Sequence, residues 1–159
     1  QTGSASWEDV GFSNNIEENF SLAKSLNKKI LFHGFNNMID LGDETFIDKL
    51  NYEYMNNLGN ISETPYYSCH FTSKKSVSKD FVSLSERIEL NYKYASQKLN
   101  KPFYIENVAW YPFRNISNWF CIPENITRFI NKFSSKFILD IAHVKVCCFH
   151  MQYYNYPQN

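Results

Sequence analysis

The sequence predicts an α/β fold: a partial parallel (β/α) barrel of the TIM type, with about four βα units in this chain. Four short apolar runs with strand character begin about 35 residues apart. Segments with helical periodicity lie between them, and strands that alternate with helices are typical of a parallel sheet. Each apolar run also ends at or near a residue that can bind a metal, which is where barrel enzymes carry their functional side chains.

The four predicted strands have an apolar body and a polar carboxyl end. They cover Lys29–Phe32, Tyr66–Phe71, Pro102–Val108 and Lys136–Ile141. Because crossovers between parallel strands are right-handed, all four carboxyl ends are expected on one rim of the sheet. The polar residues at or just after these ends are His33, His70, Glu106, Asp140 and His143.

The four predicted helices are recognised by their caps and apolar stripes. They cover Ile16–Leu26, Glu44–Leu58, Lys79–Leu99 and Pro123–Phe133. Glu17 and Glu18 suit the first turn of the first helix, where the helix dipole favours negative charge. Asp43 is the predicted cap of the second helix and Gly59 its predicted stop. Pro123 fits the first position of the fourth helix.

Composition indicates one globular domain and excludes several function classes. Of 159 residues, 43% are hydrophobic and 18% aromatic, which argues for a buried core and against disorder. Sixteen basic residues balance sixteen acidic ones, so no net field attracts nucleic acid or an anionic membrane. No apolar run approaches the roughly 20 residues that cross a bilayer, and no signal peptide is recognisable, so we expect a cytoplasmic protein.

The chain opens with a small and polar stretch, Gln1–Ser6. Residues 1–8 are expected to be a cloning remnant or a disordered N-terminus, so the predicted barrel domain covers residues 9–159. The four cysteines contain no CxxC motif and are expected to be reduced and mostly buried. Strand alternation turns Cys69 away from His70 and towards the core. For His150 the sequence leaves two alternatives, a place beside a metal site or a place on the surface.

The strand-end residues predict a metal site. A single histidine or aspartate at a strand end more often packs or caps a helix, but here three of the four histidines fall at or just after strand ends. Imidazole with carboxylate suits iron, manganese or zinc, whereas an all-oxygen set would indicate magnesium or calcium. Asp140 and His143, three residues apart, would share a face of a helix that begins there.

An aromatic segment, Ala109–Arg114, follows the third predicted strand. Loops at this rim of a barrel build substrate pockets, so the segment is either a wall of such a pocket or a loop that packs over the barrel mouth. The sequence alone does not choose between them.

The chain resembles the multinuclear non-haem iron-dependent oxidases, the family of the methanobactin-maturation oxidase, which have a xylose-isomerase-like barrel. The resemblance runs from about Lys29 to His150. It rests on the segments HGFNNMIDLGDETFIDKLNYEYMNNL, PYYSCHFT, KPFYIENVAWYPFRN and FILDIAHVKV. None of these segments is unique to the family, but their order and spacing are distinctive.

The resemblance implies a set of metal ligands and a reaction. His33, His70 and Glu106 would ligate one iron, with Glu106 as a bridge to a neighbouring iron, and Asp140 and His143 would ligate the neighbouring irons. The complete site of the family holds two or three irons and uses dioxygen as co-substrate. Family members oxidise or rearrange a cysteine of a ribosomally made peptide, often with a small partner protein that holds the leader peptide.

The chain also departs from the family, whose barrel has eight strands and needs roughly 250 residues. Only four strands are convincing here, so we expect a fragment or a shortened relative that self-associates to cover its open sheet edges. The predicted function is an iron-dependent, peptide-modifying oxidase, or the part of one that carries some of its metal ligands. Because the ligand set is incomplete, metal binding is the safer expectation and turnover the weaker one.

Two alternatives stay open at this point. One is another barrel enzyme that uses a divalent metal, such as a sugar isomerase or an endonuclease, although the neutral composition argues against DNA. The other is a non-catalytic half-barrel that serves as an assembly module, with its strand-end polar groups hydrogen-bonded instead of bound to metal.

Overall fold

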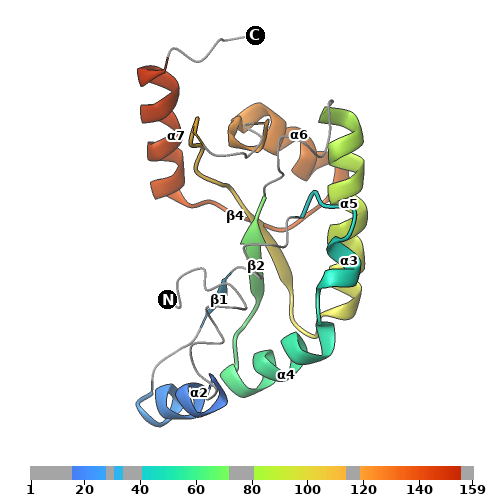
Figure 1. The fold of residues 1–159 in the computed structure, drawn as a ribbon, viewed down its shortest axis with the longest axis vertical. Helices are drawn as coiled ribbons and strands as arrows, with labels where there is room; N and C mark the ends of the chain where they lie inside the picture. The colour runs from blue at the N-terminus through green and yellow to red at the C-terminus, as the bar shows by residue number, and fades with distance from the viewer. Residues whose placement is uncertain (1–15, 28–30, 34–40, 72–80, 114–118, 155–159) are drawn as a thin grey trace.

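A computed structural model describes residues 16–27, 31–33, 41–71, 81–113 and 119–154. They form an α/β fold in which an open, all-parallel sheet alternates with helices (Figure 1). The strands follow one another across the sheet in the order of the chain, β1-β2-β3-β4. The predicted α/β class and parallel pairing are confirmed.

The centre of the sheet is the pair of strands β2 and β3. The strands are β1 (Phe32–His33), β2 (Tyr67–His70), β3 (Phe103–Glu106) and β4 (Phe137–Ile138). β2 and β3 pair along their whole length, from Tyr67 opposite Phe103 to His70 opposite Glu106. β1 and β4 are short edge strands that pair with β2 and β3 respectively. The third and fourth strands are shorter than predicted, and the fourth gives way to a helix after Asp140.

The helices lie between the strands and after the last one. They are α2 (Ile16–Ser25), α3 (Phe46–Lys49), α4 (Tyr52–Ser62), α5 (Phe81–Lys98), α6 (Pro123–Phe133) and α7 (Ile141–Tyr153), with a short 3₁₀ helix η1 (Trp119–Cys121). Helices α2, α5 and α6 confirm three of the four predicted helices, and α6 has the expected proline in its first turn. Within the described ranges, no helix is long and apolar enough to cross a membrane.

The predicted single helix at Glu44–Leu58 is wrong, because the chain forms two helices there. Leu50 is extended, with φ −88° and ψ 117°, and separates α3 from α4. The Asn51 side chain then caps α4 by accepting a hydrogen bond of 3.0 Å from a backbone N–H. Asp43, the predicted cap, instead accepts hydrogen bonds from the backbone and hydroxyl of Thr45 and stabilises the turn before α3.

Gly59 does not stop α4, as the sequence suggested, but lets it pack directly on β2. The helix continues to Ser62 and ends on Glu63, whose φ of 55° is left-handed. A Cβ atom built on Gly59 would lie 1.8 Å from the Tyr67 hydroxyl oxygen. That hydroxyl donates to the Met55 carbonyl of α4 at 2.9 Å, so the helix and the strand approach closely at this point.

One face of the sheet is apolar and covered by helices. Tyr67 and Cys69 of β2 and Phe103 and Ile105 of β3 point to this face and are buried in the main core. The core also takes buried side chains from α3 to α6 and η1: Phe46, Met55, Leu84, Ile88, Tyr92, Ala95, Phe120 and Phe129. The prediction that Cys69 faces the core is confirmed.

The opposite face of β2 and β3 is polar. Alternation along the strands gives this face Ser68 and His70 from β2 and Tyr104 and Glu106 from β3. The rings of Tyr66 and Tyr104 stack on it, with centroids 5.0 Å apart. The sheet therefore separates an apolar layer under the helices from a polar surface that ends in an imidazole and a carboxylate.

Helix α5 ties neighbouring strands together through Tyr92. Its hydroxyl donates to the Phe103 carbonyl at 3.0 Å and accepts from the Lys136 backbone N–H at 3.1 Å. The residue before it, Asn91, donates through its side chain to the Leu41 carbonyl at 2.8 Å. These bonds satisfy backbone groups at the start of β3 and in the segments before β4 and α3.

We expect Gly59→Ala to lower the free energy of unfolding by about 1–3 kcal/mol, the usual cost of an added methyl group in a tight contact. The clash with Tyr67 outweighs the better helix propensity of alanine, which is worth about 1 kcal/mol. Urea unfolding followed by circular dichroism measures the change. Glu53→Ala, at an exposed position of α4, is the matched control and should stay within about 0.5 kcal/mol of the wild type. A Gly59→Ala protein as stable as this control would contradict the close packing.

Candidate metal centre

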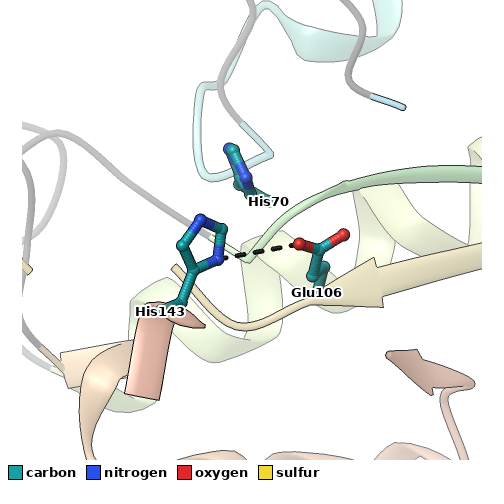
Figure 2. A group of neighbouring side chains, drawn as sticks. All are labelled: His70, Glu106 and His143. Atoms are coloured by element: carbon teal, nitrogen blue, oxygen red, sulfur yellow. Dashed lines mark ion pairs between the residues drawn. The ribbon is translucent and has the colours of Figure 1, made fainter. Parts of the chain in front are cut away.

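Three side chains converge at the carboxyl ends of the two central strands (Figure 2). His70 is the last residue of β2, Glu106 is the last residue of β3, and His143 lies in the first turn of α7. One ligand atom from each lies within 4.8 Å of the other two. This His70–Glu106–His143 group could hold a metal ion.

Glu106 provides a buried carboxylate, with only 6% of its surface exposed. Burial of a charged carboxylate is costly unless a cation faces it or it binds a metal. The His143 Nδ1 atom lies 3.6 Å from Glu106 Oε1 (Figure 2). The His70 ring meets the His143 ring edge to face, with centroids 5.2 Å apart. The chemistry of the three donors therefore fits a divalent cation.

The hydrogen bonding of His143 determines which ring nitrogen has the lone pair that can bind a metal. Its Nδ1 atom lies 2.8 Å from the Asn107 carbonyl oxygen. Because a carbonyl only accepts, Nδ1 must carry the proton, and the lone pair of the neutral ring is then on Nε2. Metal-binding histidines commonly hold their second nitrogen in this way, which fixes the ring and its tautomer.

Asn107 joins the end of β3 to the start of α7. Its buried side chain donates to the Asp140 carbonyl at 2.9 Å and accepts from the Asp140 backbone N–H at 2.6 Å. Its own backbone carbonyl meets the ring of His143. Three hydrogen bonds from one residue thus hold His143 beside Glu106, so Asn107 is a positioning residue for the group.

Asp140 caps α7 and lies outside the group of three. Its Oδ1 atom accepts from the backbone N–H of Ala142 at 2.6 Å and of His143 at 3.0 Å. The hydrogen bond from His143, with that from Ala142 and the charge of the two nearby imidazoles, keeps the pKa of Asp140 below its usual range. Its second oxygen, Oδ2, lies 3.7 Å from His143 Nδ1. The predicted role of Asp140 as a metal ligand stays a prediction.

His33 ends β1, opposite Ser68 of β2. Its side chain lies outside the part of the chain that the structure describes, so its predicted ligand role stays a prediction.

His150 lies on α7, two turns beyond His143, and its Nδ1 atom is 2.7 Å from the Trp110 carbonyl oxygen. The ring of Tyr111 meets it edge to face at 5.2 Å. His150 therefore anchors α7 to the loop after β3. It is partly buried, so it is not simply a surface residue, and it is not a member of the His70–Glu106–His143 group.

The first part of the aromatic segment after β3 is a packed loop. Trp110 is buried and contacts Val108, Cys121 and Cys147 in a second, smaller apolar cluster. Tyr111 is half-buried and Phe113 is exposed, while Arg114 is outside the described residues. Trp110 is therefore part of a packed loop. A substrate contact by the exposed end of the segment stays a prediction.

Two features of this region were missed by the sequence reasoning. Asn107 gave no signal except its position directly after Glu106. Cys147 follows His143 by four residues and precedes His150 by three, a helical spacing that would have placed the three on one stripe. Neither pattern identifies the partner that the residue meets in the fold.

Comparison with protein-family models, curated proteins and solved structures finds no match for this chain. The functional argument therefore rests on the donor atoms and on their positions in the fold.

Asn107→Ala should weaken metal binding without removing a ligand atom. It deletes two hydrogen bonds to the Asp140 backbone in a buried place, so the free energy of unfolding should fall by about 1–3 kcal/mol. The Co²⁺ affinity, followed by its visible spectrum, should fall at least tenfold because His143 is no longer held beside Glu106. Asn56→Ala, which also loses side-chain bonds to backbone but far from the site, is the matched control. Equal Co²⁺ affinities for the two variants would refute the positioning role.

The Asp140→Asn variant distinguishes a helix-capping role of Asp140 from a metal-ligand role. An asparagine still caps a helix but is a poor metal ligand, so unchanged Co²⁺ affinity means that Asp140 only caps, and a loss of tenfold or more means that it ligates. The predicted ligand role requires the second result. Asp140→Ala should in addition lose about 1 kcal/mol of stability with the cap.

The cap should also depend on pH. Because the pKa of Asp140 is lowered in the folded protein, its carboxylate stabilises the fold at pH values above the ordinary value of 3.8. That stability is lost as the pH falls through the lowered pKa. Acid unfolding curves should show this loss for the wild type relative to Asp140→Asn, whose cap does not titrate. Parallel curves for both proteins between pH 5 and about pH 2 would contradict the assignment.

Proposed function

We propose that this chain carries metal ligands of a non-haem iron-dependent oxidase that modifies a cysteine-containing, ribosomally made peptide with dioxygen. The observation that supports the proposal is the His70–Glu106–His143 group. Two imidazoles and one carboxylate, with coordination positions left open, are typical of non-haem Fe(II) sites that activate dioxygen. The peptide substrate and its cysteine come from the resemblance in sequence.

The spacing of the three donors suits one ion after a small adjustment. Nitrogen and oxygen ligands lie about 2.0–2.2 Å from such a metal, so two of them on one ion can be at most about 4.4 Å apart. The donor atoms of the group lie within 4.8 Å of one another. Three donors on one ion lie closer together than this, so side-chain rotations that move the donor atoms inwards by about 1 Å would close the site.

In this proposal the residues of the chain hold the metal and keep its open side accessible. A ferrous ion there would supply the binding of a substrate thiolate and the activation of dioxygen. Glu106 offers a negative charge that offsets part of the charge of the ion, and the Asn107 carbonyl keeps the proton of His143 on Nδ1. His33 and Asp140 are the proposed donors to further irons of a multinuclear site.

The distribution of side chains on the sheet supports a partial xylose-isomerase-like barrel as the finer fold. In a (β/α) barrel the helices cover the outside, and the side chains at the carboxyl ends of the strands form the site. Here α3 to α6 cover one face of β2 and β3, and the metal-binding group ends the other face. A sheet of this kind has open edges, so self-association of the chain stays a prediction.

A second candidate function is that of a divalent-metal hydrolase or isomerase on the same scaffold. The specific observation in its favour is the donor set itself, because two histidines and one glutamate also form catalytic zinc sites. The two candidates differ in the metal that supports activity and in their need for dioxygen.

Anaerobic titration with Fe²⁺, Mn²⁺ and Zn²⁺, followed by calorimetry and elemental analysis, tests the metal claim. The wild type should bind Fe²⁺, and His70→Ala, Glu106→Gln and His143→Ala should each lower the affinity at least tenfold, the usual minimum cost of disturbing such a site. Lys145→Ala, at an exposed position of α7 outside the group, is the control and should bind as the wild type does. His33→Ala measures whether the fourth predicted donor contributes.

A wild-type protein without measurable affinity for any of the three metals would eliminate both candidate functions. Binding that persists unchanged in Glu106→Gln and His143→Ala would place the metal elsewhere. If Fe²⁺ binds, oxygen consumption with a short cysteine-containing peptide distinguishes the candidates. Turnover that needs Mn²⁺ or Zn²⁺ and no dioxygen would favour the hydrolase or isomerase.

A further inference from the structure

Two buried thiols meet outside the metal-binding group. Cys121 ends η1 and Cys147 lies in the middle of α7, and they are 8% and 5% exposed. Both are free cysteines, and they pack together with Val108 and Trp110 in the smaller apolar cluster. The two cysteines share this four-residue cluster, and their thiols are close enough for each to shift the pKa of the other.

Cys147 is the centre of the stripe by which α7 attaches to the loop after β3. One turn before it, His143 meets the Asn107 carbonyl, and one turn after it, His150 meets the Trp110 carbonyl. Between them, the Trp110 backbone N–H donates to Cys147 Sγ at 3.1 Å. Cys147 is thus held on both sides by neighbouring contacts, in the same buried cluster as Cys121.

The surroundings make the two sulfurs unequal. The hydrogen bond from Cys121 lowers the pKa of Cys147, although burial opposes the shift, and the Trp110 N–H and the nearby imidazoles add to it. The same hydrogen bond and burial raise the pKa of Cys121. In its thiol form Cys147 also lies 3.4 Å from the Val108 carbonyl, a longer contact than that with Trp110. One sulfur is therefore the better nucleophile and the other keeps its proton.

We propose that Cys121 and Cys147 form a redox-active dithiol, which hydrogen peroxide oxidises to an intramolecular disulfide that fastens α7 to η1. The proposal stands on the packing of the two cysteines in one small buried cluster and does not depend on the proposed iron chemistry. The free-thiol count of the chain reports the reaction directly. The exposed Cys148, next to Cys147 in sequence, offers a built-in comparison because it points away from this cluster.

The reaction balances in two steps. The Cys147 thiolate attacks one oxygen of the peroxide, the O–O bond breaks, and the hydroxide that leaves takes up a proton to become water. Cys121 then attacks the sulfur of the resulting sulfenic acid, the S–O bond breaks, and a second water leaves with the thiol proton. In total, two thiols give two electrons to one peroxide, and one disulfide and two waters are formed.

The disulfide would act on the metal-binding group through α7. Cys147 lies one helical turn from His143, so a covalent link at Cys147 limits the movement of the helix turn that carries the ligand. The oxidised protein should therefore show slower amide hydrogen exchange over α7 than the reduced protein. The bond should reopen with a dithiol reductant, because the sulfurs remain in the same place.

The experiment uses the full chain with a metal chelator present, so that its outcome is independent of the iron proposal. Cys148→Ser is treated with hydrogen peroxide, the remaining thiols are alkylated, and peptides are mapped by mass spectrometry. Its free thiols should fall from three to one, with a reductant-sensitive peptide that links Cys121 to Cys147. Adding Cys121→Ser or Cys147→Ser should abolish the linked peptide, whereas adding Cys69→Ser should leave it unchanged.

Free thiols that stay at three under conditions that oxidise Cys148 in the wild type would overturn the proposal. So would a linked peptide that contains Cys69, or oxidation of Cys147 to sulfinic acid while Cys121 stays free. Circular dichroism shows whether each serine variant folds. If one does not, the peptide map of Cys148→Ser alone decides the outcome.

Discussion

The pairing of β2 with β3 is the constraint on which the rest of the site depends. It places His70 directly opposite Glu106, and neighbouring residues in register point their side chains to the same face of a parallel sheet. The imidazole and the carboxylate therefore share the polar face, while Cys69 and Ile105 enter the core on the other. A slip of the register by one residue would exchange the two faces and bury the site residues under the helices.

Helix α7 docks beside strands β2 and β3 mainly through polar contacts. Several of its apolar side chains are exposed, including Ile141, Phe149 and Tyr153, each more than 60%. Its place is instead fixed by hydrogen bonds between the backbone after β3 and the side chains of His143, Cys147 and His150. Asn107 adds to these by holding Asp140, the cap of the helix. Hydrogen bonds are directional, so they set the rotation of the helix, and with it the direction of His143, more narrowly than apolar packing alone would.

What could be predicted from the sequence is what depends on local or repeating patterns. The helices at Ile16–Ser25 and Pro123–Phe133 follow from spacing and end signals, and the strand-end positions of His70 and Glu106 follow from the handedness of the crossovers. The break at Leu50 could not be predicted, because the apolar spacing runs through it without a change of phase. Gly59 was misread for a related reason: a glycine near a predicted helix end suggests a stop, but its role is a close contact with Tyr67 in the next strand.

The contacts that assemble the site join residues far apart in the sequence. Asn107 and Asp140 are 33 positions apart, and nothing around either residue identifies the other as its partner. The contact between Cys121 and Cys147 has the same character, because it exists only after α7 has docked. Sequence patterns could therefore name candidate ligands, while the groups that position them became visible only with the fold.

Asp140 shows that a helix cap and a metal ligand are compatible roles for one carboxylate. Its Oδ1 atom is engaged by the first N–H groups of α7, and its Oδ2 atom lies near the ring of His143. A cation bound by His70, Glu106 and His143 would sit close to the N-terminal end of α7, whose partial positive charge disfavours it. Asp140 accepts hydrogen bonds from the first N–H groups of the helix and so reduces that charge, whether or not it also coordinates the ion. Metal binding would then link β2, β3 and α7, so the ion and the docking of the helix should stabilise each other.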